Sequence, residues 1–143
     1  MESLALPGAM RDEMVAHVLQ GLPNEACGVL VGMGGRPLKH IPTRNSDASP
    51  VKYNIHPEDL VRIEIEKDKQ GWEYIAFYHS HTFSEAYPST TDVRLAFWPG
   101  SDMLLYPDAL YIVISLRDRA KPEMRAFHIK PKQVQEVPIQ VEG

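Results

Sequence analysis

The sequence lacks several features that would place it in a specialised class of protein. It contains one cysteine, Cys27, among 143 residues. A single thiol can form neither an internal disulfide nor a four-cysteine zinc site, so we expect the reducing cytoplasm as its compartment. No stretch approaches the roughly 20 apolar residues of a membrane-spanning helix. Residues 1–10 also lack the basic and apolar runs of a signal peptide, so export is not expected.

An excess of positive charge is also absent. The 15 Lys and Arg residues are outnumbered by 19 Asp and Glu residues, and the formal net charge is -4. Proteins that bind nucleic acids or membrane surfaces usually present a basic surface, so we expect neither as a partner. The length, the 43% of hydrophobic residues and the lack of repeats predict a single domain over residues 1–143. Nothing in the composition indicates an oligomeric state.

Hydrophobic periodicity and turn residues predict the order of helices and strands. Apolar residues at spacings of three and four indicate a helix near the start of the chain. Pro57, followed by Glu58 and Asp59, suits the first turn of a second helix. We expect helices at 10–20, 57–70 and 91–98, strands at 28–32, 37–43, 74–79, 109–116 and 124–129, an extended piece at 51–55 and a weakly extended tail at 134–141. This order predicts an α/β or α+β domain whose mixed sheet is flanked by helices.

A His-x-His pair at the end of a predicted strand is the most informative feature. His79 and His81 are two residues apart, so their side chains should lie on one face of the sheet. Ser89 or Thr90 can cap the following helix, which places Asp92 in its first turn. Two imidazoles and one carboxylate suit zinc, and three protein ligands leave a fourth position for water. We therefore expect one catalytic Zn²⁺ per chain.

A zinc-activated water also needs a base, and Glu25 is the candidate. It lies just before the predicted strand 28–32, too far along the chain from His79 for spacing to place it. Each residue also has an ordinary interpretation: Ser89 as a helix cap, Asp92 as a carboxylate at the helix dipole, Glu25 as a solvated loop residue. Cys27 is expected to be a small buried apolar side chain.

Taken together, these residues resemble the JAMM motif of the MPN-type metalloproteases. That motif is a Glu, then His-x-His, seven residues, a Ser, two residues and an Asp, and every position is filled here. The resemblance covers roughly residues 10–130 and implies a fold like that of the cytidine deaminases. It also implies roles: zinc ligands at His79, His81 and Asp92, a general acid/base at Glu25, and at Ser89 a group that steadies the water or the oxyanion.

The residues that follow the second histidine narrow the resemblance to one subgroup of the family. Thr82 stands where many family members have proline, and the run from His81 to Ser89 is similar to a bacterial subgroup. That subgroup removes a cysteine from the C-terminus of a ubiquitin-like sulfur-carrier protein, which implies a partner with a Gly-Gly tail. An extended tail can add to a sheet edge. Arg44, Asn45 and Tyr53 are the expected substrate-binding residues, although an ordinary connecting loop explains this region equally well.

Two other functions remain open at this point. An isopeptidase that removes a ubiquitin-like modifier from lysines would use the same motif, and some MPN domains are scaffolds without a metal. The complete motif argues against a scaffold. A nucleobase deaminase is excluded because it needs a Pro-Cys-x-x-Cys segment, and the His-Glu-x-x-His motif of other zinc proteases is absent.

Overall fold

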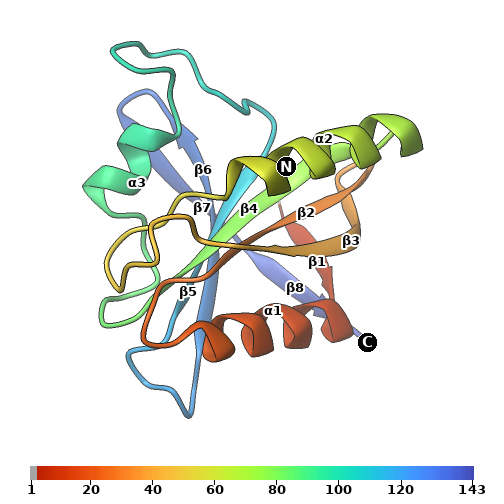
Figure 1. Cartoon of the computed structure of the whole chain (residues 1–143). Coiled ribbons are helices and arrows are strands. Elements are labelled where there is room, and N and C mark those ends of the chain that lie inside the picture. Colours follow the sequence, from red (N-terminus) through yellow and green to blue (C-terminus); the bar gives the residue numbers. More distant parts are fainter. Residues whose placement is uncertain (1–2) are drawn as a thin grey trace.

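The structure is a computed structural model that describes residues 3–143, so residues 1 and 2 of the expected domain lie outside it (Figure 1). Three helices and eight strands follow one another along residues 3–143. They are β1 (Leu4–Pro7), α1 (Gly8–Gly21), β2 (Cys27–Met33), β3 (Arg36–Thr43), α2 (Pro57–Gln70), β4 (Glu73–His81), α3 (Thr90–Leu95), β5 (Leu110–Ser115), β6 (Glu123–Lys130), β7 (Gln133–Val137) and β8 (Ile139–Glu142).

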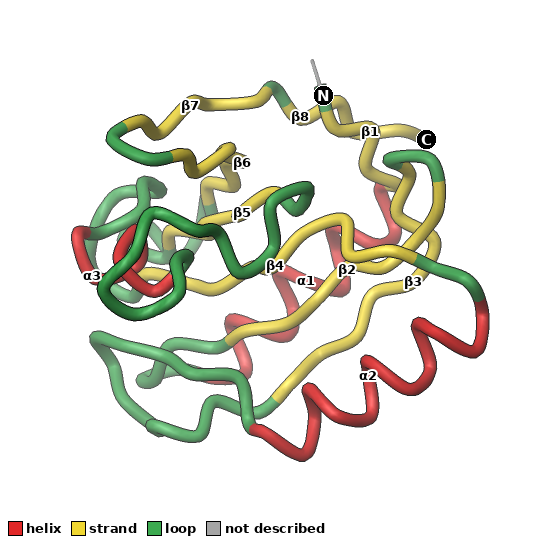
Figure 2. Tube along the Cα trace, turned by 90° about the horizontal axis from the view of Figure 1, so that it is seen from above, coloured by secondary structure: helices red, strands yellow, loops and turns green. Residues whose placement is uncertain are grey.

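Within the described residues, six strands form the main sheet in the order β3-β2-β4-β5-β6-β7. The pair β4–β5 is parallel and the other neighbouring pairs are antiparallel. Strands β1 and β8 form a separate parallel pair, which brings the two ends of the described chain side by side (Figure 2). The mixed sheet with helices confirms the expected fold class.

Helices α1 and α2 cover opposite faces of the main sheet (Figure 1). Helix α1 buries Met10, Met14 and Val18 in one hydrophobic cluster. Helix α2 contributes Ile63 to a second cluster on the other face. Because side chains alternate along a strand, Tyr78 of β4 joins the α1 cluster, whereas the residues on either side of it point toward the α2 side. The two histidines of β4 therefore face the side of the sheet that carries α2.

Most expected elements agree with the structure to within a few residues, but the helix expected at 91–98 is shorter. It ends at Leu95, because the chain then folds back on itself. Phe97 forms an isolated bridge with Leu104, and the amide of Trp98 donates to the carbonyl of Met103. Ala96 is buried there, so packing of this loop ends the helix before Pro99 is reached.

One further expectation needs correction, and the expected extended tail is confirmed and more regular than predicted. The piece at 51–55 is a loop in which only Ile55 forms a bridge, with Asn45. The tail at 134–141 is two strands, β7 and β8, on either side of Pro138. Strand β1 was not expected, because its partner β8 lies at the other end of the chain and local periodicity cannot reveal such a pairing. Among the helices of residues 3–143, none combines the length and apolar character needed to cross a membrane.

Candidate metal centre

The two histidines of the motif project from the end of β4, inside the sheet. His79 and His81 are both buried, at 2% and 5% exposure. His79 lies in register with Cys27 on β2 and with Val113 on β5, so strands flank it on both sides. The backbone at the end of β4 is therefore held by hydrogen bonds to two neighbours, and this fixes the direction of both imidazoles.

Asp92 reaches the histidines from the first turn of α3. Ser89 is the N-cap residue, as one of the two sequence alternatives proposed. Its Oγ accepts a hydrogen bond from the Asp92 amide at 3.0 Å. In return, the Ser89 amide donates to Oδ2 of Asp92 at 2.9 Å. This reciprocal capping box turns the carboxylate back toward the start of the helix, where β4 ends.

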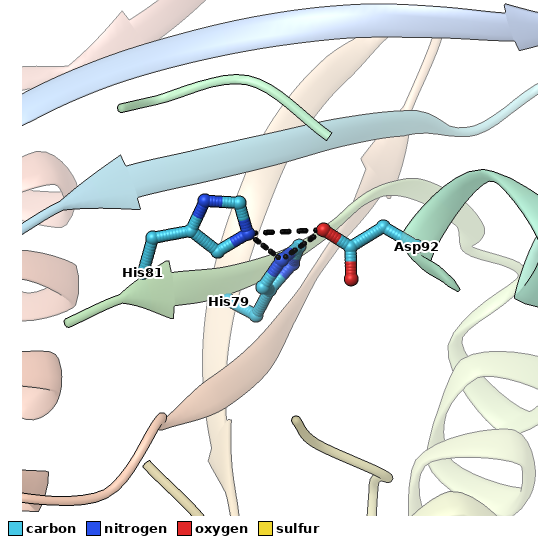
Figure 3. A group of neighbouring side chains, drawn as sticks. All are labelled: His79, His81 and Asp92. Carbon is cyan, nitrogen blue, oxygen red and sulfur yellow. Dashed lines mark hydrogen bonds and ion pairs between the residues drawn. The ribbon is translucent and has the colours of Figure 1, made fainter. Parts of the chain in front are cut away.

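The three side chains converge on one point (Figure 3). The Nε2 atoms of His79 and His81 are 3.2 Å apart, and each is 3.0 Å from Oδ2 of Asp92. Zinc–ligand bonds of 2.0–2.1 Å in a tetrahedron would separate the ligand atoms by about 3.3 Å. Among the described residues, these three form the one group whose ligand atoms all lie within 4.8 Å. The donor set and its spacing fit a zinc ion with an open position.

The surroundings of His81 leave its Nε2 free to act as a ligand. Its Nδ1 lies 2.9 Å from the backbone carbonyl of Glu85. A carbonyl only accepts, so Nδ1 carries a proton, and Nε2 is the nitrogen that faces the cluster. In the zinc-free protein, burial lowers the pKa of the His81 imidazole, but its hydrogen bonds to the Asp92 carboxylate and to the Glu85 carbonyl raise it more, and the net pKa is above its ordinary value.

Charge in the cluster is divided between the carboxylate and the imidazoles. Burial raises the pKa of Asp92, but hydrogen bonds from His79 and His81 outweigh burial and hold this pKa well below its ordinary range. Burial lowers the pKa of His79 despite its hydrogen bond to Asp92. An ionised Asp92 and a neutral His79 suit a zinc site, whereas His81, whose pKa is raised, would give up its Nε2 proton when zinc binds.

Glu25 lies beside the cluster but does not belong to it. Its side chain is buried, and its carboxylate is not among the three converging ligands. Burial raises its pKa to about 7, while the charge of His81 lowers this pKa and that of Asp92 raises it. Its backbone is fixed on both sides, because its amide donates to Ser49 and its carbonyl accepts from the side chain of Asn45. A protonatable carboxyl group therefore stands close to the three ligands.

The three residues expected to bind substrate have different surroundings. Arg44 forms an ion pair with Asp59, with Nη2 3.0 Å from Oδ1. The Asn45 side chain donates to the carbonyls of Glu25 and Lys52, so it supports the loop after β3. Strand β3 is an edge strand of the main sheet. The polar groups of Arg44 and Asn45 are thus engaged within the chain at this edge.

Tyr53 is the one of the three that contacts the cluster itself. Its ring stacks on the imidazole of His79, with the centroids 4.2 Å apart and the planes 18° from parallel. Burial raises its pKa well above the ordinary value, so its hydroxyl stays protonated. Cys27 is fully buried, as expected, and its sulfur accepts a hydrogen bond from Thr43.

Sequence reasoning missed two residues that organise the centre. Ser80 accepts a hydrogen bond from the Ala26 amide at 2.9 Å and so aligns the chain around Glu25 with β4. The Glu85 carbonyl orients His81. Ser80 stands inside the motif, but alternation points it away from the metal ligands, and a backbone carbonyl leaves no sequence signal at all.

A mixed α+β domain with an open His-His-Asp centre defines a class of metal-dependent hydrolases, and comparison with known proteins identifies the family. The model for prokaryotic homologs of the JAB domain matches residues 7–130, and the chain belongs to this family. It is 37% identical over 140 residues to the CysO-cysteine peptidase of Mycobacterium tuberculosis, covering 96% of this chain and 90% of that protein. It is 38% identical over 104 residues to the desampylase of Haloferax volcanii, covering 68% and 75%. These relatives confirm that the chain is a hydrolase of the peptidase class.

Solved structures agree with the fold. A solution structure of a protein from Desulfitobacterium hafniense matches with a TM-score of 0.81 and 35% identity, covering 96% of this chain and 92% of that one. A JAB1/MPN domain protein from Archaeoglobus fulgidus matches with a TM-score of 0.57 and 14% identity, covering 96% and 99%. The second match shows the fold alone, and it is the fold that the motif implied.

Proposed function

We propose that this protein is a zinc-dependent peptidase that cuts after the C-terminal Gly-Gly of a ubiquitin-like sulfur-carrier protein and releases cysteine. The observation that carries the proposal is the convergence of His79, His81 and Asp92, with spacings of 3.0–3.2 Å, beside the buried carboxyl group of Glu25. The 37% identity to a CysO-cysteine peptidase supports the choice of substrate.

In peptide hydrolysis, the three ligands would bind the metal and Glu25 would transfer the proton. A zinc ion held by the three ligands would supply Lewis acidity toward the scissile carbonyl and would make water acidic enough to lose a proton near neutral pH. Glu25 accepts that proton and delivers it to the leaving amine. In the zinc-free protein burial raises its pKa to about 7, in the range of a group that must be both base and acid in one cycle. No other described side chain combines burial and a raised carboxyl pKa at this centre.

Ser89 and Tyr53 complete the proposed centre. Ser89 uses its oxygen as acceptor for the Asp92 amide, which leaves its O–H free to donate to the developing oxyanion. Tyr53 covers one face of His79 and limits the movement of this ligand. The zinc, the substrate tail and a cytoplasmic location are all parts of this proposal.

The test uses zinc-loaded protein and two substrates with the same carrier. One is the M. tuberculosis CysO protein extended by a C-terminal cysteine, and the other is the same CysO joined through its C-terminus to a lysine side chain. We expect cysteine release from the first to exceed cleavage of the second by at least about tenfold in kcat/KM, which corresponds to about 1.4 kcal/mol in transition-state binding. Failure to cut either substrate with stoichiometric zinc bound would reject the proposal.

The second candidate function is removal of a ubiquitin-like modifier from lysines. The 38% identity to a desampylase favours it. The two activities share one centre and differ in the amine that leaves, so the reverse order of the two rates would select this candidate. A scaffold without metal is the third candidate, and it requires that no zinc binds even though all five motif positions are filled.

A further inference from the structure

The loop between β4 and α3 positions two of the three ligands, His81 and Asp92. The carbonyl of Glu85 receives Nδ1 of His81 at 2.9 Å and also the amide of Tyr87 at 2.9 Å. Two residues further along the chain, Ser89 caps the helix that carries Asp92. A shift of this short segment would therefore move both the orientation of one metal ligand and the origin of another.

Buried side chains of β5 and β6 pack against the loop between β4 and α3. Ala86 is fully buried and packs in one small cluster with Val113 of β5 and Phe127 of β6. The Tyr87 ring meets the Phe127 ring edge to face, with centroids 5.2 Å apart at 73°. Edge-to-face aromatic pairs contribute about 0.5–1.5 kcal/mol beyond the area they bury. The middle of the loop is thus docked on β5, the neighbour of β4, and on β6, one strand further from the histidines.

The ion pair between Arg125 and Glu136 lies next to this aromatic contact. The Arg125 guanidinium lies 5.3 Å from the Phe127 ring centroid and 6.0 Å from that of Tyr87. It also binds Glu136 of β7 through two parallel hydrogen bonds of 2.7 and 3.0 Å. A bidentate pair fixes the plane of a guanidinium, and a fixed plane can face both rings as a cation–π partner.

We propose that Tyr87 and Arg125 are positioning residues for the metal centre. They form, with Phe127 and Glu136, an anchor that keeps the Glu85 carbonyl on Nδ1 of His81 and so keeps Nε2 of His81 directed at the metal. The inference rests on the proposed zinc site. Neither residue is one of the three ligands, and the anchor acts through the backbone of the loop.

The first measurement is zinc affinity, by competition with a chromogenic chelator at pH 8. Changes to the outer hydrogen-bond partners of metal ligands typically cost about 10–100-fold in metal affinity. We expect Tyr87→Ala to raise the zinc Kd by about tenfold and Arg125→Ala to change it in the same direction. Tyr87→Phe keeps the ring and should restore the wild-type Kd. Glu136→Gln, which keeps the shape of its side chain, is the milder variant if the alanine variants unfold.

The matched control is Arg36→Ala. Arg36 forms a comparable exposed pair with Glu142 at 3.1 Å, between β3 and β8 and away from the loop. The Arg36→Ala variant should have the zinc Kd of the wild type. If Tyr87 and Arg125 only stabilise the fold, their variants should have a lower melting temperature. Their zinc Kd should then stay like that of the Arg36→Ala control.

The second measurement needs no metal. Long-range ¹H–¹⁵N correlation spectra of the zinc-free protein report which ring nitrogen of His81 carries the proton. We expect a proton on Nδ1 in the wild type and in Tyr87→Phe, and in Tyr87→Ala a mixture in which part of the molecules carry the proton on Nε2 alone. An unchanged tautomer together with a Kd within twofold of wild type in both alanine variants would overturn the inference. If the wild type itself binds no zinc, the proposed function fails, and the tautomer alone decides on the anchor.

Discussion

Ala26 and Ser80 exchange two hydrogen bonds at the point where the chain enters the metal centre. The Ala26 amide donates to Oγ of Ser80 at 2.9 Å, and the Ser80 amide donates to the Ala26 carbonyl at 2.9 Å. Both residues are buried. The exchange aligns the segment that precedes β2 with the end of β4, and this alignment puts Glu25 next to the strand position of His81.

Replacement of Ser80 by alanine should therefore weaken both stability and turnover. Loss of Oγ leaves the buried Ala26 amide without an acceptor, at a cost of about 1–3 kcal/mol in the free energy of unfolding. The zinc Kd should change little, because Ser80 points to the face opposite the ligands. Urea unfolding and kcat measure the two effects. Ser101→Ala, at an exposed turn, is the control and should change stability by no more than about 0.5 kcal/mol. Wild-type stability of Ser80→Ala would contradict this role.

Replacement of Glu25 by glutamine should separate catalysis from metal binding. Glutamine preserves the size of the side chain but cannot carry a proton from water to the leaving amine. We expect stoichiometric zinc and a loss of about 10²–10⁴-fold in kcat, the usual contribution of general acid–base catalysis. Zinc content by mass spectrometry and release of cysteine from the carrier are the readouts. Full activity in this variant would remove Glu25 from the mechanism.

The sequence was sufficient to predict the parts of this centre that depend on local geometry. Alternation in β4 puts His79 and His81 on one face, and the capping position of Ser89 predicts where Asp92 falls. Contacts between residues that are distant in the sequence could not be predicted from it. Stacking of Tyr53 on His79 requires the path of an irregular loop, and the β1–β8 pairing requires the two chain ends to meet. Periodicity carries no information on either.

Changes at Asp92 should reveal that it serves both the metal and the helix. Asp92→Ala removes a ligand and the capping box, so zinc affinity should fall by more than about 100-fold, beyond the usual loss for an outer-shell change. The zinc-free protein should lose about 1 kcal/mol of stability with the cap. Asp92→Asn can still accept from the Ser89 amide, so it should keep most of the stability and lose the zinc. Stoichiometric zinc in Asp92→Ala would refute its role as a ligand.

Replacement of Ser89 by alanine should affect the rate more than the metal. The Oγ acceptor for the Asp92 amide is lost, at a cost of about 1 kcal/mol in stability. Loss of one donor to an oxyanion typically lowers kcat by about 10²–10³-fold. Ser89→Thr restores both a hydroxyl donor and a cap and should recover much of the rate. If kcat of the alanine variant equals that of the wild type, Ser89 is a helix cap and nothing more.

His40 should make the stability of the zinc-free protein depend on pH. Its Nε2 lies 2.6 Å from the hydroxyl of the buried Tyr78 and its Nδ1 3.1 Å from the Glu13 carboxylate, with the His17 ring 6.4 Å away. Burial lowers the pKa of His40 below 6.5, although the hydrogen bond to Glu13 opposes this and the charge of His17 adds to it. At His40, the unfolded chain then binds more protons than the folded one in the window just below pH 6.5.

The contribution of His40 to stability should therefore be fully present above pH 6.5 and decline as the pH falls toward its folded pKa, whereas Glu25, with its pKa raised to about 7, contributes in the opposite sense. Urea unfolding between pH 5 and 8, with a chelator present, measures the sum of these contributions. In His40→Gln the stability at pH 8 minus that at pH 5 should be lower than in the wild type, because glutamine can still contact Tyr78 but does not titrate. His56→Asn, which keeps an acceptor at the N-cap of α2, serves as the control with the wild-type difference. An equal difference in His40→Gln and the wild type would show that protonation of His40 does not oppose folding.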